Sequence, residues 1–329
     1  MTQTQPRPAR AAAPSTAPAQ ERGFVAATVS FVSVFAAGAA AIPLYDTYRR
    51  ADGLTNDQFS LVAVAYFACA VFALLVLGRL SNHCGRRPVS IAALLLAAAG
   101  CLTLLWVHSF LPLLLGRSLQ GLAAGLASSA IGAYIVDTAP RRPRWLVAAV
   151  TTAAATVGLP LGVFLSGLLV EFAPAPRVLT HCVFAVLLLG CAAALATRPE
   201  TVARTPGAWS SLIPRLGVPT AARPYLPLAS GIFVATWAFG GYFTSFGPSI
   251  AGRFTPAAAR RAGMGLATSG SMNTLLHEAL PRERAGLLAV IYAISYTGSA
   301  VPSLIAGQAS RGLSLPAITA GYAALAVLV

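Results

Sequence analysis

Long apolar runs separated by short, arginine-containing polar segments constrain this chain more than any other feature. A helix that crosses a membrane needs about 20 mostly apolar residues. Nine runs reach or approach that length: 24–45, 58–80, 88–108, 111–137, 146–171, 177–197, 225–250, 286–308 and 314–329. A tenth stretch, 262–280, is weakly apolar and contains His277 and Glu278, so a poor span, an interfacial helix and a loop all fit it. The pattern predicts an all-α, polytopic membrane protein.

The composition indicates lipid as the natural solvent and bilayer partner of the chain. Only 10% of the residues are charged and 57% are hydrophobic, whereas soluble domains carry about 25% charged residues. The net charge of +14 would suit a nucleic-acid ligand. However, all 23 basic residues are arginines that lie between the apolar runs, with no basic-aromatic patch. We therefore expect no nucleic-acid partner.

The sequence lacks the residue patterns of catalytic and metal sites. Its five cysteines show no CxxC or Cys/His spacing, so we expect no metal centre. A GxxxxGK[ST] phosphate loop is impossible without lysine, and no nucleophile–base arrangement stands out. The chain is therefore not expected to be an enzyme, to bind a cofactor or to be driven by its own ATP hydrolysis.

The arginine distribution predicts the orientation and the domain organisation. With the N-terminus inside, the inner segments of the first six runs hold 13 arginines and the outer ones hold 3. Because inner loops are enriched in Lys and Arg, this favours a multi-pass cell-membrane protein with a cytoplasmic N-terminus. The predicted parts are a disordered cytoplasmic tail without a cleaved signal peptide, a six-helix bundle, a cytoplasmic linker and an incomplete second bundle. They cover residues 1–22, 23–197, 198–223 and 224–329.

The loop between the second and third runs carries the most specific motif. From Gly78 to Arg87 it reads GRLSNHCGRR, and Gly85 can supply a tight turn. One interpretation is a charge anchor at the headgroups. The segment also resembles G-x-L-a-D-x-x-G-R-R, a signature that lies between helices two and three in the major facilitator superfamily of secondary transporters. The resemblance implies a latch that helps to hold the outward-facing state. It assigns to that latch Gly78, Leu80, Asn82, Gly85, Arg86 and Arg87, and Asn82 stands where the family has Asp.

The fourth run supports the same resemblance. Its segment 113–121, LLLGRSLQG, is similar to the family pattern l-x-x-x-R-x-x-q-G. A charge within a span is expensive and usually faces the bundle interior, so we predict a pathway or coupling role for Arg117, Gln120 and Gly121. The alternative is that Arg117 snorkels to the outer headgroups. The resemblance also implies that Asp137, at the inner end of this run, pairs with Arg86 in the latch.

The fifth run contains the four residues Gly158, Pro160, Gly162 and Gly167, which we predict to act as hinge or packing positions. They loosely resemble the Gly/Pro-rich fifth helix of the drug/proton antiporters, without the Gly-Pro and Gly-Gly pairs of that pattern. A kinked packing helix explains them equally well. Proton coupling needs a titratable group within the membrane, and no acid lies centrally in a clear span.

The resemblance leads to two hypotheses about function. The first is a secondary transporter that exports a small, largely apolar compound by alternating access, with proton coupling left open. The second is a degenerate, non-transporting membrane protein derived from such a transporter. The family has two related six-helix halves. Here helices eight, nine and much of ten are expected to be missing, with a truncated C-terminus, which leaves about 9–10 spans.

Overall fold

A computed structural model describes residues 17–140 and 145–213, with single positions at 224, 227, 305, 308, 312, 313 and 317. Within these residues all regular structure is helical, which confirms the predicted all-α class. The second bundle lies outside the described residues, apart from those single positions. The expectations for 225–250, 262–280, 286–308 and 314–329, including the shortening of the second half, therefore stay predictions.

Six helical segments of the described chain are long and apolar enough to cross a membrane. Their bounds are Ala19–Asp52, Asn56–Leu77, Arg86–Trp106, Phe110–Thr138, Trp145–Phe172 and Pro176–Ala196. Five of them coincide with the predicted runs within three residues, and the first, Ala19–Asp52, extends beyond the predicted run 24–45 at both ends. The sequence placed the end of a disordered tail at residue 22, whereas helix α1 already begins at Ala17.

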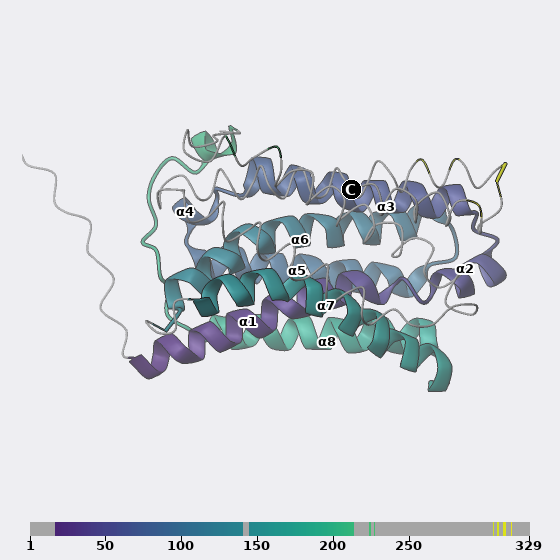
Figure 1. The fold of residues 1–329 in the computed structure, drawn as a ribbon, viewed down its shortest axis with the longest axis horizontal. Helices are drawn as coiled ribbons and strands as arrows, with labels where there is room; N and C mark the ends of the chain where they lie inside the picture. The colour runs from purple at the N-terminus through teal and green to yellow at the C-terminus, as the bar shows by residue number, and fades with distance from the viewer. Residues whose placement is uncertain are drawn as a thin grey trace, which may run out of the picture.

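The helices lie side by side as an elongated bundle (Figure 1). The elements are α1 (Ala17–Ala40), α2 (Tyr45–Asp52), α3 (Asn56–Phe72), the π-helical η1 (Ala73–Leu77), α4 (Ser81–Cys84), α5 (Arg86–Thr103), the 3-10 helix η2 (Leu104–Trp106), α6 (Phe110–Thr138), α7 (Trp145–Phe172), α8 (Pro176–Ala196) and the 3-10 helix η3 (Trp209–Leu212). Helix α1 packs on α6, α7 and α8, while α5 packs on α6 and α8, and α3 packs on α6.

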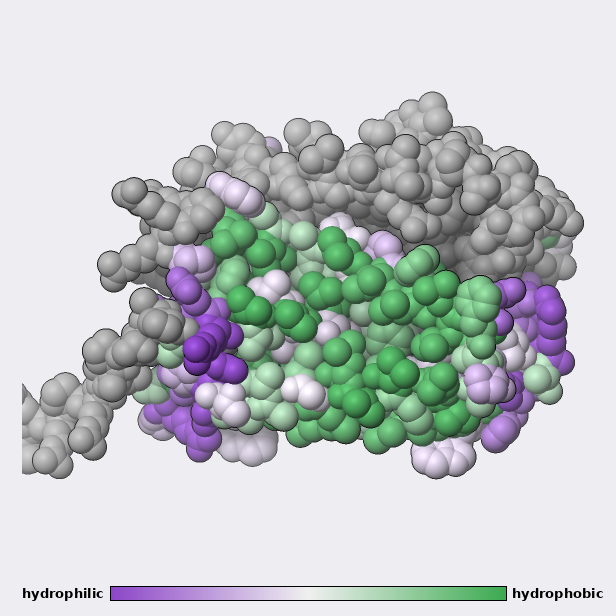
Figure 2. All heavy atoms as spheres, turned by 90° about the horizontal axis from the view of Figure 1, so that it is seen from below, coloured by the Kyte–Doolittle hydropathy of each residue, from purple (hydrophilic) through white to green (hydrophobic). Residues whose placement is uncertain are grey.

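The bundle has two polar ends (Figure 2), which we name after the short helices that lie at them (Figure 1). The α4 end gathers the α3–α5 connection, the end of α6 and the segment after α8. The α2 end gathers α2, the loop after η2 and the start of α8. Between them, Figure 2 shows an apolar belt on the surface. Exposed apolar side chains on α7 and α8 include Leu161, Phe164, Leu168, Phe172, Val186 and Leu189. A belt of this kind suits a lipid-facing wall.

Local sequence signals set where the helices begin and end. Gly85 has φ of 99° and Gly53 has φ of 68°, a backbone region that glycine enters without steric cost. Gly85 thus makes the tight turn that the motif predicted. The Gln58 Oε1 accepts a hydrogen bond from the Thr55 amide at the start of α3 (3.0 Å), and Pro176 opens α8 where its missing N–H costs nothing.

Helix α7 approaches the backbone of α1 through glycines. A Cβ added to Gly158 would lie 2.7 Å from the Val32 oxygen, and one added to Gly162 would meet the backbone oxygen of Ala36. Gly167 is different, because a Cβ there would meet nothing within 4 Å. Helix α6 uses the same device against α3, where Gly121 faces the backbone of that helix. Such small-residue contacts let membrane helices approach closely.

Replacing Gly162 by Ala tests this close approach. The added methyl group would push α7 from α1, and overpacking costs about 1–3 kcal/mol. The matched change Gly167→Ala has open space and should leave stability equal or raise it, since Ala is favoured over Gly in a helix by roughly 0.5–1 kcal/mol. Thermal unfolding of both variants in one detergent measures the difference. Equal midpoints would contradict the packing account.

Candidate functional site

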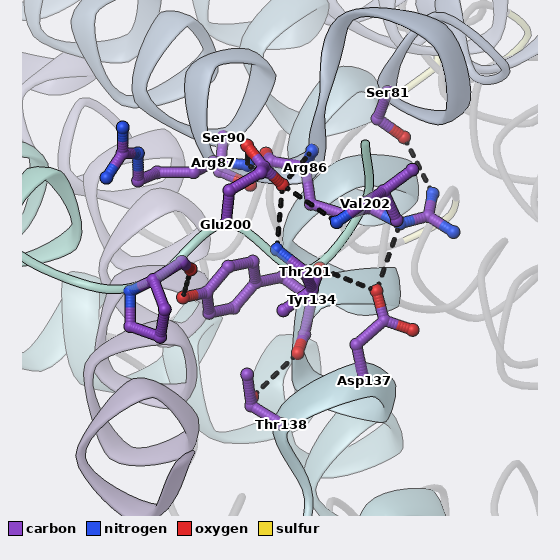
Figure 3. A network of polar contacts seen from close by, with 11 residues as sticks. Ser81, Arg86, Arg87, Ser90, Tyr134, Asp137, Thr138, Glu200, Thr201 and Val202 are labelled. Carbon is purple, nitrogen blue, oxygen red and sulfur yellow. Dashed lines mark hydrogen bonds and ion pairs between the residues drawn. The ribbon is translucent and has the colours of Figure 1, made fainter. Parts of the chain in front are cut away.

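A polar network at the α4 end joins the loop motif to α6 and to the segment after α8 (Figure 3). The Arg86 Nε lies 3.3 Å from the Asp137 Oδ2, with both side chains less than a third exposed. Arg86 Nη1 also donates to the Ser81 Oγ (2.8 Å), and the Thr201 hydroxyl donates to the same Asp137 oxygen (2.8 Å). The structure thus brings together the two residues whose pairing the sequence predicted.

Glu200 is the second acid of this network, and its carboxylate caps the start of α5. Its Oε1 accepts from the Arg86 amide (2.8 Å), and its Oε2 accepts from the Arg87 amide (3.1 Å). It also accepts from the Thr201 and Val202 amides. The first N–H groups of a helix lack intrahelical partners and carry the positive end of the helix dipole. A carboxylate here satisfies both requirements.

Glycine at position 85 is required twice. Beside its positive φ, a Cβ there would lie 2.6 Å from the Glu200 Oε2. Arg87 also binds the segment after α8, since its Nη1 donates to the Arg198 oxygen (2.9 Å). The amide of Thr205 donates to the His83 oxygen (3.0 Å). The chain after α8 is therefore laid across the motif.

The remaining motif residues have smaller parts in the network. Gly78 ends the π-helical turn of η1, and Leu80 packs against the main core cluster. Asn82 makes no side-chain hydrogen bond with the described residues. The carboxylate nearest to this loop comes instead from Glu200, in the segment that follows α8 at the same end of the bundle.

Arg117 lies inside the bundle, and its side chain is only 6% exposed. Its Nη1 donates to the Gly38 oxygen of α1 and to the Gln120 Oε1 (2.8 Å). Its guanidinium carbon sits 4.4 Å from the centroid of the Tyr66 ring. This burial among protein partners is the interior placement that the sequence favoured over snorkelling, and Gln120 lies in the same cluster.

The partners of Arg117 follow from a break in the first span. Helix α1 ends at Ala40 and the chain resumes as α2 at Tyr45, so the run predicted at 24–45 is not one continuous helix. Pro43 lies within the break. It has no N–H to donate, and it disfavours helical backbone at the residue before it. The last four carbonyls of α1 consequently lose their intrahelical donors.

All four of these carbonyls have partners in the described structure. The Ala39 oxygen accepts from the Ile42 amide (3.1 Å). Side chains of α6 and α7 donate to the others: Gln120 Nε2 to the Ala37 oxygen (3.3 Å), Arg117 to the Gly38 oxygen and Ser166 Oγ to the Ala40 oxygen (2.6 Å). We call these residues the α1-break cluster: Ala37, Gly38, Ala40, Tyr66, Arg117, Gln120 and Ser166.

The position of Arg117 in this cluster explains how a cation is tolerated there. A helix C-terminus carries roughly −0.5 of an elementary charge, and a partly buried cation beside it gains up to about 2 kcal/mol. The Tyr66 ring adds a cation–π interaction of about 2 kcal/mol when desolvated. These terms offset the several kcal/mol that burying a charge costs. A neutral donor would satisfy the carbonyl without the dipole interaction.

A second cluster ties α2 to α8 at the α2 end. The Tyr48 hydroxyl lies 3.0 Å from the Nε2 of His181, which is fully buried. Arg177 pairs with Asp52, and its guanidinium carbon lies 5.1 Å from the centroid of the Tyr48 ring. His108 approaches the same carboxylate, Nδ1 to Oδ1 3.8 Å. The short helix after the break is thereby anchored to the sixth span.

Sequence reasoning missed several of these residues, although two left a signal. Glu200 is the single acid among the arginines of 198–223, and an acid just after a span is well placed to meet a helix N-terminus. Pro43 inside an apolar run is a direct sign of a helix break. The Ser166 and His181 contacts left no such signal, because nothing local reveals which distant backbone group a buried polar side chain meets.

Replacing Glu200 by Ala should lower the stability of the bundle by about 1–2 kcal/mol, the usual cost of losing a helix cap. Glu200→Gln should cost less, because one acceptor oxygen remains while the charge at the α5 N-terminus is lost. Thermal unfolding in detergent measures both, with Glu171→Ala at an exposed acid as the control. A loss no larger than that of the control would show that the cap contributes nothing.

Comparison with known proteins places this fold. Residues 23–329 match the family model of the Major Facilitator Superfamily. Among curated proteins, 70 residues are 39% identical to Monosaccharide-sensing protein 2 of Arabidopsis thaliana, covering 21% of the chain and 10% of that protein. A stretch of 92 residues is 32% identical to Multidrug resistance protein MdtL of Klebsiella pneumoniae, covering 28% of the chain and 24% of that protein. The chain thus spans less than a quarter of the length of the curated relatives that it matches.

Solved structures show the same fold at low sequence identity. The human organic anion transporter MFSD10 superposes with a TM-score of 0.60 at 16% identity, over 94% of this chain and 98% of that one. The partially occluded inward-open xylose transporter XylE of E. coli gives 0.61 at 15% identity, over 88% and 91%. The nucleoside transporter NupG gives 0.61 at 12% identity, over 93% and 97%.

Proposed function

The chain belongs to the major facilitator superfamily, and on this premise we propose that it is a secondary active transporter that exports a small, largely apolar compound by alternating access. The observation that carries the proposal is the network at the α4 end. It joins the loop, α6 and the segment after α8 through Arg86, Asp137 and Glu200. The segments are joined at the surface by hydrogen bonds and by the Arg86–Asp137 ion pair, and partly exposed polar contacts of this kind can open and reclose at low cost.

The same network supports a role as a latch between states. Exposed or partly exposed ion pairs contribute about 0–1 kcal/mol each, a magnitude that can bias an equilibrium without locking it. The residues that would form the latch are those assigned by the resemblance, Arg86 and Asp137 among them, together with Glu200. Alternating access in such transporters consists of one bundle rocking against the other around a central site.

The proposal includes an orientation. Among the described residues near the membrane boundary, arginines outnumber acids at the α4 end, with Arg79, Arg86, Arg87 and Arg198 beside Asp137 and Glu200. At the α2 end they do not, with Arg49, Arg50 and Arg177 beside Asp46, Asp52 and Asp57. Because the inner side of a membrane protein is enriched in arginine, the α4 end and the N-terminus would face the cytoplasm, with the chain in the cell membrane.

An apolar compound is favoured over a sugar because several buried hydroxyls of the described bundle already donate to its own backbone, while Thr180 Oγ1 is buried without a hydrogen-bond partner. Ser30, Ser90 and Ser128 donate to carbonyls one turn earlier in their own helices, at 2.7, 2.8 and 2.7 Å. Ser166 donates to the α1 break. A sugar site needs unspent polar side chains, because unpaired hydroxyls of a bound sugar would be costly. The relative named as a multidrug resistance protein is in line with export.

Flux in proteoliposomes tests the proposal. A panel of labelled apolar compounds and labelled xylose is loaded into vesicles with the full chain, with an Arg117→Ala form or without protein. We expect efflux of at least one apolar compound with the wild-type chain, and at least about a tenfold loss, roughly 1.4 kcal/mol, in the variant. Repeating the assay with an imposed proton gradient tests proton coupling.

The control for loss of charge is Arg50→Gln, at an arginine whose side chain is 80% exposed. It should transport like the wild type. Equal flux in wild-type, variant and empty vesicles for every compound would reject a transporter and favour the non-transporting alternative. Faster efflux of xylose than of the apolar compounds would reject the proposed substrate class.

A further inference from the structure

We propose that one edge of the Arg117 guanidinium is the binding site for an anionic group, of the carboxylate class, on the transported compound. The inference rests on the proposed function and narrows its substrate to an apolar body with a single anionic head. Some N–H donors of Arg117 are hydrogen-bonded within the α1-break cluster, and others have no partner there.

The described protein supplies acceptors to one end of the guanidinium and leaves the donors of the adjoining edge without hydrogen-bond partners. Nη1 makes both hydrogen bonds, to the Gly38 oxygen and to the Gln120 Oε1. Nε is buried and has no hydrogen-bond partner among the described residues. Nη2 makes none with them either. Nε and Nη2 lie side by side on one edge of the planar group, and a pair of parallel N–H donors matches the two oxygens of a carboxylate.

The orientation of this edge is fixed before any ligand arrives. The Tyr66 ring lies against the guanidinium, with its centroid 4.4 Å from the central carbon. The Nη1 bonds fix rotation within the plane. Arg117 is only 6% exposed. A ligand group meeting this edge would lose its water, and charge-assisted hydrogen bonds in a dry site are the strong ones.

No acid in the described chain is bonded to this cation. Asp46 pairs with Arg49 and Arg50, and Asp52 pairs with Arg177. At the other end of the bundle, Asp137 and Glu200 belong to the network around Arg86. The other three described acids are Asp57, in the first turn of α3, and Glu21 and Glu171, both exposed.

The dipole of α1 compensates only part of the charge. A helix C-terminus is equivalent to roughly −0.5 of an elementary charge. The Tyr66 ring lowers the cost of burial further but carries no net charge, so the position keeps a net positive charge. Buried charges are ordinarily paired. An anionic ligand would complete the compensation and take up the two open donors together. A neutral ligand would leave both donors without a partner.

A binding assay tests this without requiring flux. The full chain in phosphatidylcholine nanodiscs is titrated calorimetrically with benzoate, 3-phenylpropanoate and octanoate, each paired with its neutral amide. We expect at least one acid to bind the wild-type chain at least tenfold more tightly than its amide. The ratio should fall to about one in Arg117→Gln. It should be reduced in Arg117→Lys, which keeps the charge and loses the two-donor edge.

Arg50→Gln is the matched control, since it removes an exposed arginine and should keep the preference for the acid. If Arg117→Gln does not fold, the ratio of acid to amide affinity in Arg117→Lys tests the inference. The inference is overturned if no acid binds, if acid and amide bind equally, or if the preference survives in Arg117→Lys at full size. It is also overturned if acids bind only to the variants Glu278→Gln or Glu283→Gln. In that case one of these glutamates, and not a ligand, would be the partner of the Arg117 donors.

Two further arms separate related explanations. If phosphatidylglycerol in the nanodiscs abolishes acid binding, the edge belongs to a lipid headgroup, and the assignment to the solute is wrong. Flux of an apolar amide as fast as that of its acid would overturn this inference while leaving the transporter proposal intact. Preferential acid binding with no flux of any compound would instead remove the proposed function and keep the anion site.

Discussion

The buried charge of Arg117 at the C-terminus of α1 is the interaction on which the arrangement of this bundle depends. Pro43 prevents α1 from continuing, and the break leaves four carbonyls without helical donors. Side chains from α6 and α7 satisfy three of them. The break thus couples the first, fourth and fifth spans at one depth. Arg117 satisfies one of these carbonyls and is also the one buried arginine among the described residues.

The break also relates the interior to the two ends. Beyond it, α2 is tied to α8 by Tyr48 with His181 and by Asp52 with Arg177. At the opposite end, Glu200 and Asp137 hold the loop motif. The α1–α7 and α3–α6 contacts through glycine allow close backbone packing without interlocked side chains. The described bundle thus combines closely packed helix pairs with polar junctions at its two ends.

Much of this fold could be predicted from the sequence because hydropathy in a membrane is a strong constraint. Runs of about 20 apolar residues have few alternatives to a spanning helix. The positive φ of Gly85 and the burial of Arg117 followed from the cost of the alternatives. Pro43 signals the break, but the apolar residues on both sides of it favour one continuous span. Glu200 stands out in the sequence as a lone acid, but which amides it caps does not follow from the sequence, since they lie 113 and 114 residues away along the chain.

Hydrogen–deuterium exchange of the full chain in nanodiscs tests the central claim most directly, by comparing the wild type with Arg117→Met. If Arg117 holds the break, amides in 41–52 should exchange at least about tenfold faster in the variant, equivalent to roughly 1.4 kcal/mol of local opening. Amides of α5, Arg86–Thr103, should exchange as before. Unchanged exchange in 41–52, or an equal rise along the whole bundle, would contradict the account.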